Sequence, residues 1–85
     1  MSSFDARLRM AGQAGFPLGI EINLTEGRMV VTTDGRELAD WALEDIRIAP
    51  TPSGFRIDAE GEAVIINVTD HERFTSAVGS RLQPL

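Results

Sequence analysis

The stretch 38–48 constrains the fold most, because its apolar residues change phase partway along. The two sets are Ala39, Trp41 and Leu43 at odd positions and Ile46 and Ile48 at even positions. A β-strand turns alternate residues to opposite faces, so one straight strand cannot point both sets into the same core. We therefore expect two strands, 38–43 and 45–49, with a bend or bulge near Glu44 and Asp45.

The length and composition are those of one small globular domain. The chain has 85 residues, of which 42% are hydrophobic and 25% charged, so we expect a single domain over 1–85 with one core and no deep cofactor cavity. There is no cysteine, which excludes disulfides, thiolate metal sites and cysteine nucleophiles. We find no apolar run of about 18 residues and no signal peptide, and we expect a cytoplasmic protein.

The charge excludes several classes of partner. The net charge is −5, whereas nucleic-acid binding depends on neutralising phosphates with cations. Bulk attraction to an anionic membrane is disfavoured for the same reason. All eight basic residues are arginine, so Schiff-base chemistry and the lysine of a phosphate-binding loop are absent.

Five further segments alternate or are rich in β-branched residues, which predicts strands: 4–10, 19–25, 28–34, 54–59 and 62–68. Three two-residue turns separate apolar runs and predict hairpins: Glu26-Gly27, Asp34-Gly35 and Glu60-Gly61. For 4–10 the alternative is a short helix capped by Ser3. We favour the strand, because the helix would leave Met10 exposed. We expect Phe16 and Leu18, in the first loop, to tuck under the sheet.

The period changes at Thr69. Thr69 and Glu72 have the spacing of a capping box, and apolar residues then recur at helical spacing, which predicts a helix over 70–82. The core should therefore be built from both strands and helix, with Trp41, Leu43, Ile46, Ile48, Phe55, Ile57, Phe74 and Val78.

Seven strands followed by one helix resemble a pleckstrin-homology-like (PH-like) domain. The section Asp40–Ile48 followed by Gly54–Ile57 is similar to small bacterial members in which a strand ending in Trp precedes an acidic bend. The resemblance implies a mainly β fold, a bent antiparallel barrel or sandwich of seven strands capped by the C-terminal helix. Another small barrel or sandwich with an appended helix is the alternative.

The resemblance also implies a ligand to be tested against the residues. Phosphoinositide-binding members carry basic residues on the first two strands. Arg7 and Arg9 fit the first half of that pattern, but the second strand has Glu21 and Asn23 in the corresponding outward positions. Anionic headgroup or phosphate binding at the first loop is therefore an alternative function.

We interpret the polar clusters as surface features and not as catalytic or metal-binding sites. His71, with Ser76 and Asp70 near it, falls in a solvated first helical turn, so we interpret it as a surface residue. Asp58, Glu60 and Glu62 lack the spacing of a calcium loop. A second acidic cluster contains Glu37, Asp40, Glu44 and Asp45. We interpret that cluster as a solvated face or a docking surface for a basic partner.

We therefore expect a non-catalytic protein-interaction or scaffold module with no cofactor or metal. The expected mechanism is capture of a partner protein on an exposed strand edge, or in the groove between that edge and the helix. The candidate contact residues are Arg7, Arg9, Glu37 and Asp40. Contact between the arginines of one copy and the acids of another would make a homo-oligomer, which is the third candidate function.

Overall fold

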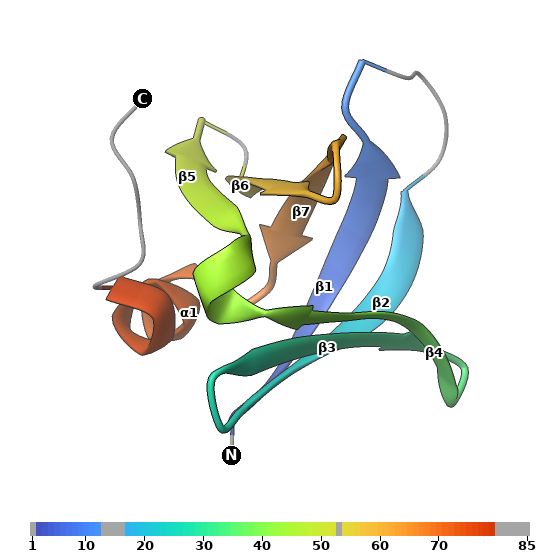
Figure 1. Cartoon of the computed structure of the whole chain (residues 1–85), viewed down its shortest axis with the longest axis vertical. Coiled ribbons are helices and arrows are strands. Elements are labelled where there is room, and N and C mark those ends of the chain that lie inside the picture. The colour runs from blue at the N-terminus through green and yellow to red at the C-terminus, as the bar shows by residue number, and fades with distance from the viewer. Residues whose placement is uncertain (1, 13–16, 53, 80–85) are drawn as a thin grey trace.

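A computed structural model describes residues 2–12, 17–52 and 54–79 (Figure 1). It is mainly β, with seven strands, one 3-10 turn and one helix. In chain order these are β1 Ser2–Met10, β2 Leu18–Thr25, β3 Arg28–Thr33, β4 Arg36–Ala42, η1 Leu43–Asp45, β5 Arg47–Thr51, β6 Gly54–Ala59, β7 Glu62–Val68 and α1 His71–Val78. The strand predicted for 4–10 is thus confirmed over its helical alternative.

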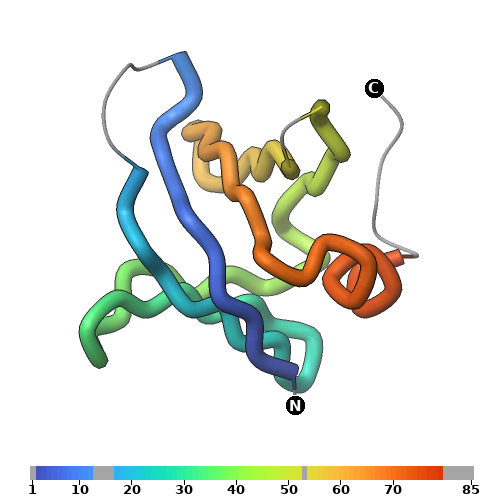
Figure 2. The backbone as a smooth tube through the Cα atoms, turned by 180° about the vertical axis from the view of Figure 1, so that it is seen from behind, coloured from blue at the N-terminus to red at the C-terminus, as the bar shows by residue number. Residues whose placement is uncertain are grey.

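The strands form one antiparallel sheet in the order β4-β3-β2-β1-β7-β6-β5. β4 and β5 follow each other in the chain but occupy opposite edges of this sheet. The sheet therefore curls into a half-barrel that brings the two edges round toward each other, with η1 as the connection. Seen from behind, β1 and β7 cross the middle of the curled sheet (Figure 2).

The predicted phase change is resolved by η1. Ala42 is extended (φ −69°, ψ 130°), the next three residues form one 3-10 turn, and the chain is extended again at Ile46. Ile46 and Ile48 are buried on the far side of this corner. Trp41 and Leu43 differ from the expectation, since each is only partly buried against the core. Trp41 lies at the open side of the half-barrel, and Leu43 is the first residue of η1.

All three predicted hairpin turns are present. Glu26, Asp34 and Glu60 have φ of 47°, 50° and 52°, and the glycine after each has φ between 76° and 80°. Positive φ at both central residues defines the type I′ turn, whose twist matches that of the flanking strands. These turns hold β2 to β3, β3 to β4 and β6 to β7 in fixed register.

The core fills the concave side of the sheet. Its largest fully buried side chains come from both halves of the sheet and from the helix: Phe4, Ile22, Met29, Val31, Ile48, Phe55, Ile57, Ile66, Phe74 and Val78. Leu18 is an exception to the predicted packing, because 46% of it is exposed at the end of the sheet. Phe16 lies outside the described residues.

The helix closes one end of this core through Phe74. The Phe74 ring meets the Phe4 ring edge-on at 5.1 Å between centroids and lies 4.8 Å from the Phe55 ring. Arg73 fixes the same end to β1, because its guanidinium donates to the Ser3 carbonyl oxygen (2.7 Å) and lies 4.3 Å from the Phe4 ring centroid. The apolar face of the helix thus covers the first strand as well as the last.

The start of the helix differs by one residue from the prediction. Asp70, and not Thr69, is the N-cap, and its carboxylate accepts hydrogen bonds from the backbone N–H (3.2 Å) and Nε (3.2 Å) of Arg73. A carboxylate caps as well as a hydroxyl and also opposes the helix dipole. α1 ends at Val78; the rest of the predicted helix includes residues 80–82, outside the described part of the chain.

Gly54 allows β6 to approach β7 closely. Its φ is 153°, and a Cβ built there would overlap the Ile66 carbonyl oxygen and lie 3.1 Å from the Asn67 Cα. We expect Gly54→Ala to lower the free energy of unfolding by about 2–3 kcal/mol, because either backbone must move. Urea denaturation measures this change in the free energy of unfolding. Gly19→Ala is the control, since its Cβ would meet nothing within 4 Å; equal loss in both variants would contradict this role.

The corner at η1 requires its full length. Deleting Glu44 shortens the connection between opposite sheet edges and reverses the phase of the residues that follow. We expect a loss of about 3 kcal/mol or more in urea unfolding, because one apolar set must leave the core. Glu44→Ala keeps the length and should cost less than about 0.5 kcal/mol. A deletion variant as stable as the substitution would show that the corner lies elsewhere.

Candidate functional site

The open side of the half-barrel contains a cavity of about 160 Å³ between β4 and the β6–β7 hairpin, which we call the seam cavity. Its lining comes from two places far apart in sequence: Leu38, Ala39, Asp40 and Trp41 from β4, and Ile57, Ala59, Glu60, Glu62 and Val64 from β6, β7 and their turn. A cavity of about 150 Å³ is enough to hold a benzene molecule. The seam cavity is therefore of the size of one apolar side chain.

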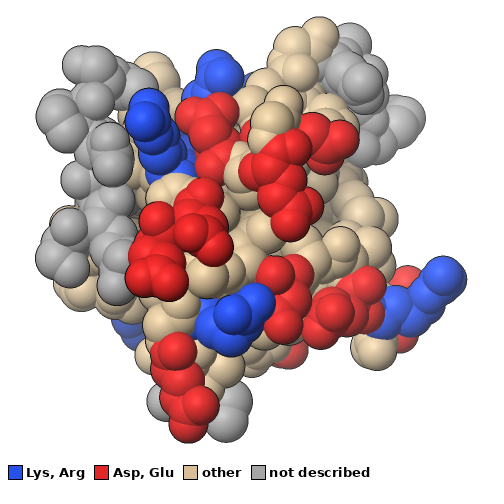
Figure 3. Space-filling model, in the orientation of Figure 1, with Lys and Arg blue, Asp and Glu red and all other residues tan. Residues whose placement is uncertain are grey.

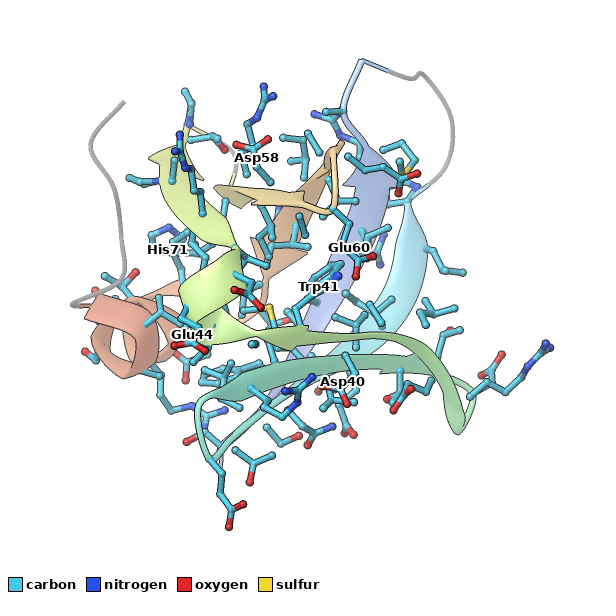
Figure 4. The ribbon with its side chains drawn as sticks, in the orientation of Figure 1. Asp40, Trp41, Glu44, Asp58, Glu60 and His71 are labelled. Carbon is cyan, nitrogen blue, oxygen red and sulfur yellow. The ribbon has the colours of Figure 1, made fainter. Side chains whose placement is uncertain are left out.

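Trp41 forms one wall of this cavity. Figure 4 shows its side chain pointing from β4 toward the β6–β7 hairpin, with Glu60 beside it. Trp41 pairs with Met29 on β3, which places its backbone within the ladder while the indole stays only partly buried. An indole held in this way offers a large apolar surface without the entropic cost of ordering a mobile side chain.

A bulge in β4 exposes a second apolar side chain at the same place. Val31 pairs with Ala39 and the next residue of β3, Thr32, pairs with Glu37, so Leu38 is the extra residue on β4. Leu38 is 48% exposed and lines the seam cavity with Trp41. A bulge of this kind bends the strand and redirects a side chain out of its regular alternation.

The outer edge of β4 has N–H groups available for pairing, whereas the Asp40 carbonyl oxygen accepts a hydrogen bond from the Arg28 guanidinium at 3.4 Å. Leu43 donates its N–H to the Gly27 carbonyl oxygen at 2.8 Å, so the pair of Leu43 with Gly27 is a hydrogen-bonded one. The pairs on β3 therefore alternate, and Ala42 and Asp40 turn their N–H groups away from β3. In the described part of the chain no strand pairs with this edge.

The other edge of the sheet is less suited to pairing. β5 has five residues, one of which is Pro50. A proline has no N–H to give to β6 and fits such a strand with its nitrogen toward the open side. That removes an outward donor and is a common way of protecting an edge. The structure therefore favours β4 over β5 as the available edge.

Acidic side chains lie at the seam cavity and on η1: Asp40, Glu60 and Glu62 line the cavity, whereas Glu44 and Asp45 do not. Figure 3 shows them spread over the face that contains β4, η1 and the β6–β7 turn. We call five of these exposed residues the acidic rim: Asp40, Glu44, Asp45, Glu60 and Glu62. Asp40 forms an ion pair with Arg28 (2.7 Å), whereas the other four form none with described residues. The mouth of the cavity is therefore a region of negative potential.

The structure separates the four candidate contact residues into two groups. Glu37 and Asp40 are exposed on β4, on either side of the bulge. Arg7 and Arg9 lie on the outer face of β1 and line a hollow of about 340 Å³ with Pro17, Ile65 and Asn67. Three strand spacings separate β1 from β4, so the basic and acidic candidates do not form one site within a single molecule.

His71 is exposed and packs on the core from outside. Its ring stacks on the Phe55 ring at 4.7 Å between centroids and 20° between planes. Its carbonyl oxygen accepts a hydrogen bond from the Thr75 hydroxyl at 2.9 Å. The Asp70 carboxylate next to it is engaged by Arg73, so the described contacts of His71 are those of a residue that anchors the helix.

The hairpin acids behave as separate charges. Asp58 pairs with Arg56 at 3.1 Å, while Glu60 and Glu62 face the seam cavity. Within residues 2–12, 17–52 and 54–79, no group of three or more His, Asp or Glu side chains is arranged to hold a metal ion. Glu60 and Glu62 therefore contribute charge to the acidic rim.

Sequence reasoning missed the contribution of the β6–β7 turn to this site. Nothing in the local sequence pattern indicates that Glu60 and Glu62 lie next to β4. One signal for the β4 side was present: Leu38 is apolar at an even position next to Ala39 and Trp41 at odd ones. An apolar residue out of phase at the start of a strand indicates a bulge.

Comparison with known proteins adds no assignment to this site. In the part of the chain that the structure describes, no helix has both the length and the apolar character that crossing a membrane requires. No protein-family model matches this sequence, and no curated protein is similar enough to it to be called a relative.

Proposed function

We propose that this chain is a non-catalytic protein-interaction module that binds an extended segment of a partner protein as an added strand on β4. The observation that carries the proposal is the outward-facing N–H of Ala42 beside the seam cavity and the partly buried Trp41. Strand addition combines main-chain hydrogen bonds, which supply affinity, with pockets for alternate side chains, which supply specificity.

The chemistry of the partner follows from the cavity and its rim. An added strand turns every second side chain toward the seam cavity, which has room for one apolar group next to Trp41. The remaining side chains meet a rim that includes Glu60 and Glu62. The bound segment should therefore alternate apolar residues with arginine or lysine.

The strand order and the position of the helix support the further proposal that the chain is PH-like. The seven strands and the single helix that packs on Phe4 and Phe55 match what that resemblance implies. Because one fold serves many functions, the binding proposal rests on the edge of β4 and not on the likeness.

A second candidate is the binding of anionic headgroups or phosphates by Arg7 and Arg9. It is favoured by one observation, that among the described residues no carboxylate lines the hollow these arginines share. Co-sedimentation with vesicles containing an anionic phospholipid at low salt tests it. Binding that Arg7→Gln with Arg9→Gln abolishes would support this candidate, and the absence of binding would remove it.

The sole tryptophan reports binding at β4 directly. We expect a synthetic peptide that alternates valine and arginine to shift the Trp41 emission to shorter wavelength, because the added strand would cover the indole. The same peptide with glutamate in place of arginine should bind at least about tenfold more weakly at low salt. Equal binding of both peptides, or no shift with either, would contradict the proposal.

Ala42→Pro separates strand addition from binding by charge alone. The Ala42 φ of −69° is that of proline, and its N–H is not used by β3, so the fold should be retained. We expect the valine–arginine peptide to bind about 3- to 10-fold more weakly, as for one lost hydrogen bond of about 0.5–1.5 kcal/mol. Unchanged affinity would show that β4 does not pair with the peptide.

Neutralising two acids of the acidic rim tests the contribution of charge to peptide binding. Glu60→Gln with Glu62→Gln should weaken the same peptide about 3- to 10-fold at low salt and less at high salt, where exposed charges are screened. Glu72→Gln is the matched control, because Glu72 is an exposed acid on α1, away from the seam cavity. An equal effect of both variants would mean that only net charge matters.

A further inference from the structure

The sheet register places the arginines of β1 beside an apolar residue of β7, a neighbour that the sequence does not reveal. Ile65 on β7 has Arg9 of β1 directly opposite on one side and Arg56 of β6 on the other. Arg7 of β1 lies opposite Asn67 of the same β7. These residues alternate with the buried ones, so all of them point outward. We call Arg7 and Arg9 of β1 the arginine face; Arg56 is not part of it, because it lines a separate hollow with Asp45, Glu60 and Glu62 of the acidic rim.

The register keeps the arginine face beside Ile65. Neighbouring strands are about 4.8 Å apart, so Ile65 of β7 lies about 5 Å from the backbone of Arg9, its partner on β1. Ile65 is partly exposed and, with Asn67, lines the hollow that Arg7 and Arg9 border. Arg7 and Arg9 form no ion pair with other described residues, while Arg56 pairs with Asp58. The arginine face thus places two positive charges beside one partly exposed apolar residue, Ile65, although Arg7 also lines a hollow with Asp5 and Glu21.

The arginine face and the acidic rim lie on different sides of the molecule. The acidic side chains gather on the side shown in Figure 3, around β4, η1 and the β6–β7 turn. β1, which carries the arginine face, crosses the middle of the opposite view in Figure 2. One molecule therefore presents complementary charges in two directions, although its net charge is −5.

We propose that copies of this chain associate head to tail, with the arginine face of one copy against the acidic rim of the next. The occupant is a second copy because the chain itself carries the complementary charges, and Ile65 supplies the apolar centre of the contact. The contact joins two different surfaces, so it is heterologous. Repeating it gives an open chain or a ring of copies, and not a two-fold dimer.

The inference rests on the proposed function in one respect, since both use the acidic rim. A basic segment bound on β4 and the arginine face of a second copy would compete for Glu60 and Glu62. Association should therefore decrease when the valine–arginine peptide is added. It should also decrease with salt, because exposed charges are screened over about 8 Å at physiological ionic strength.

Sedimentation velocity with two neutralised variants tests the arrangement. One variant is Arg7→Gln with Arg9→Gln, which disables the arginine face; the other is Glu60→Gln with Glu62→Gln, which disables the acidic rim. We expect the wild-type sedimentation coefficient to rise with concentration up to about 1 mM and each variant alone to remain monomeric. An equimolar mixture of the two should form a one-to-one dimer that grows no further, because only one intact contact is left.

The outcomes separate this inference from the proposed function. A wild-type protein that stays monomeric at about 1 mM and about 0.05 M salt overturns the inference, and so does a mixture that stays monomeric or a variant that associates like the wild type. Peptide binding to Trp41 in that case would still support the function. Arg36→Gln is the control, since Arg36 belongs to β4 and to neither surface; circular dichroism verifies that each variant is folded.

Discussion

The connection between β4 and β5 is the constraint on which the rest of this structure depends. These strands are the two edges of one seven-stranded sheet, which if flat would place them about 29 Å apart. The chain from Ala42 to Arg47 can span at most about 18 Å when fully extended. Three of these residues form η1, which is shorter than extended chain. The sheet must therefore curl, and its concave side becomes the core that Phe74 of the helix closes at one end.

The same constraint produces the candidate site. The short connection brings the edges toward each other without pairing β4, so β4 keeps outward-facing main-chain groups beside Trp41. The curl also carries the β6–β7 turn across to β4, which places Glu60 and Glu62 on a cavity with Leu38. A site made in this way depends on the corner at η1, although no residue of η1 lines it.

The sequence alone predicted the features that depend on residues close together in the chain. The phase change between Trp41 and Ile46 predicted the corner, and three pairs ending in glycine predicted the hairpins, because each depends on residues next to one another. The site depends on contacts between remote segments. That Glu60 lies beside Trp41, or that Arg9 and Arg56 flank Ile65, follows from the register of strands distant in sequence, which alternation alone does not determine.

The charges around β4 also limit what can pair with its edge. An open edge is a template for edge-to-edge association, and two copies meeting through β4 would bring Glu60 and Glu62 of each against the acids of the other. That repulsion disfavours a symmetric edge pair and leaves the edge accessible to positively charged surfaces. In the binding proposed above, the acidic rim would therefore disfavour the same edge of a second copy and favour a basic strand or the arginine face.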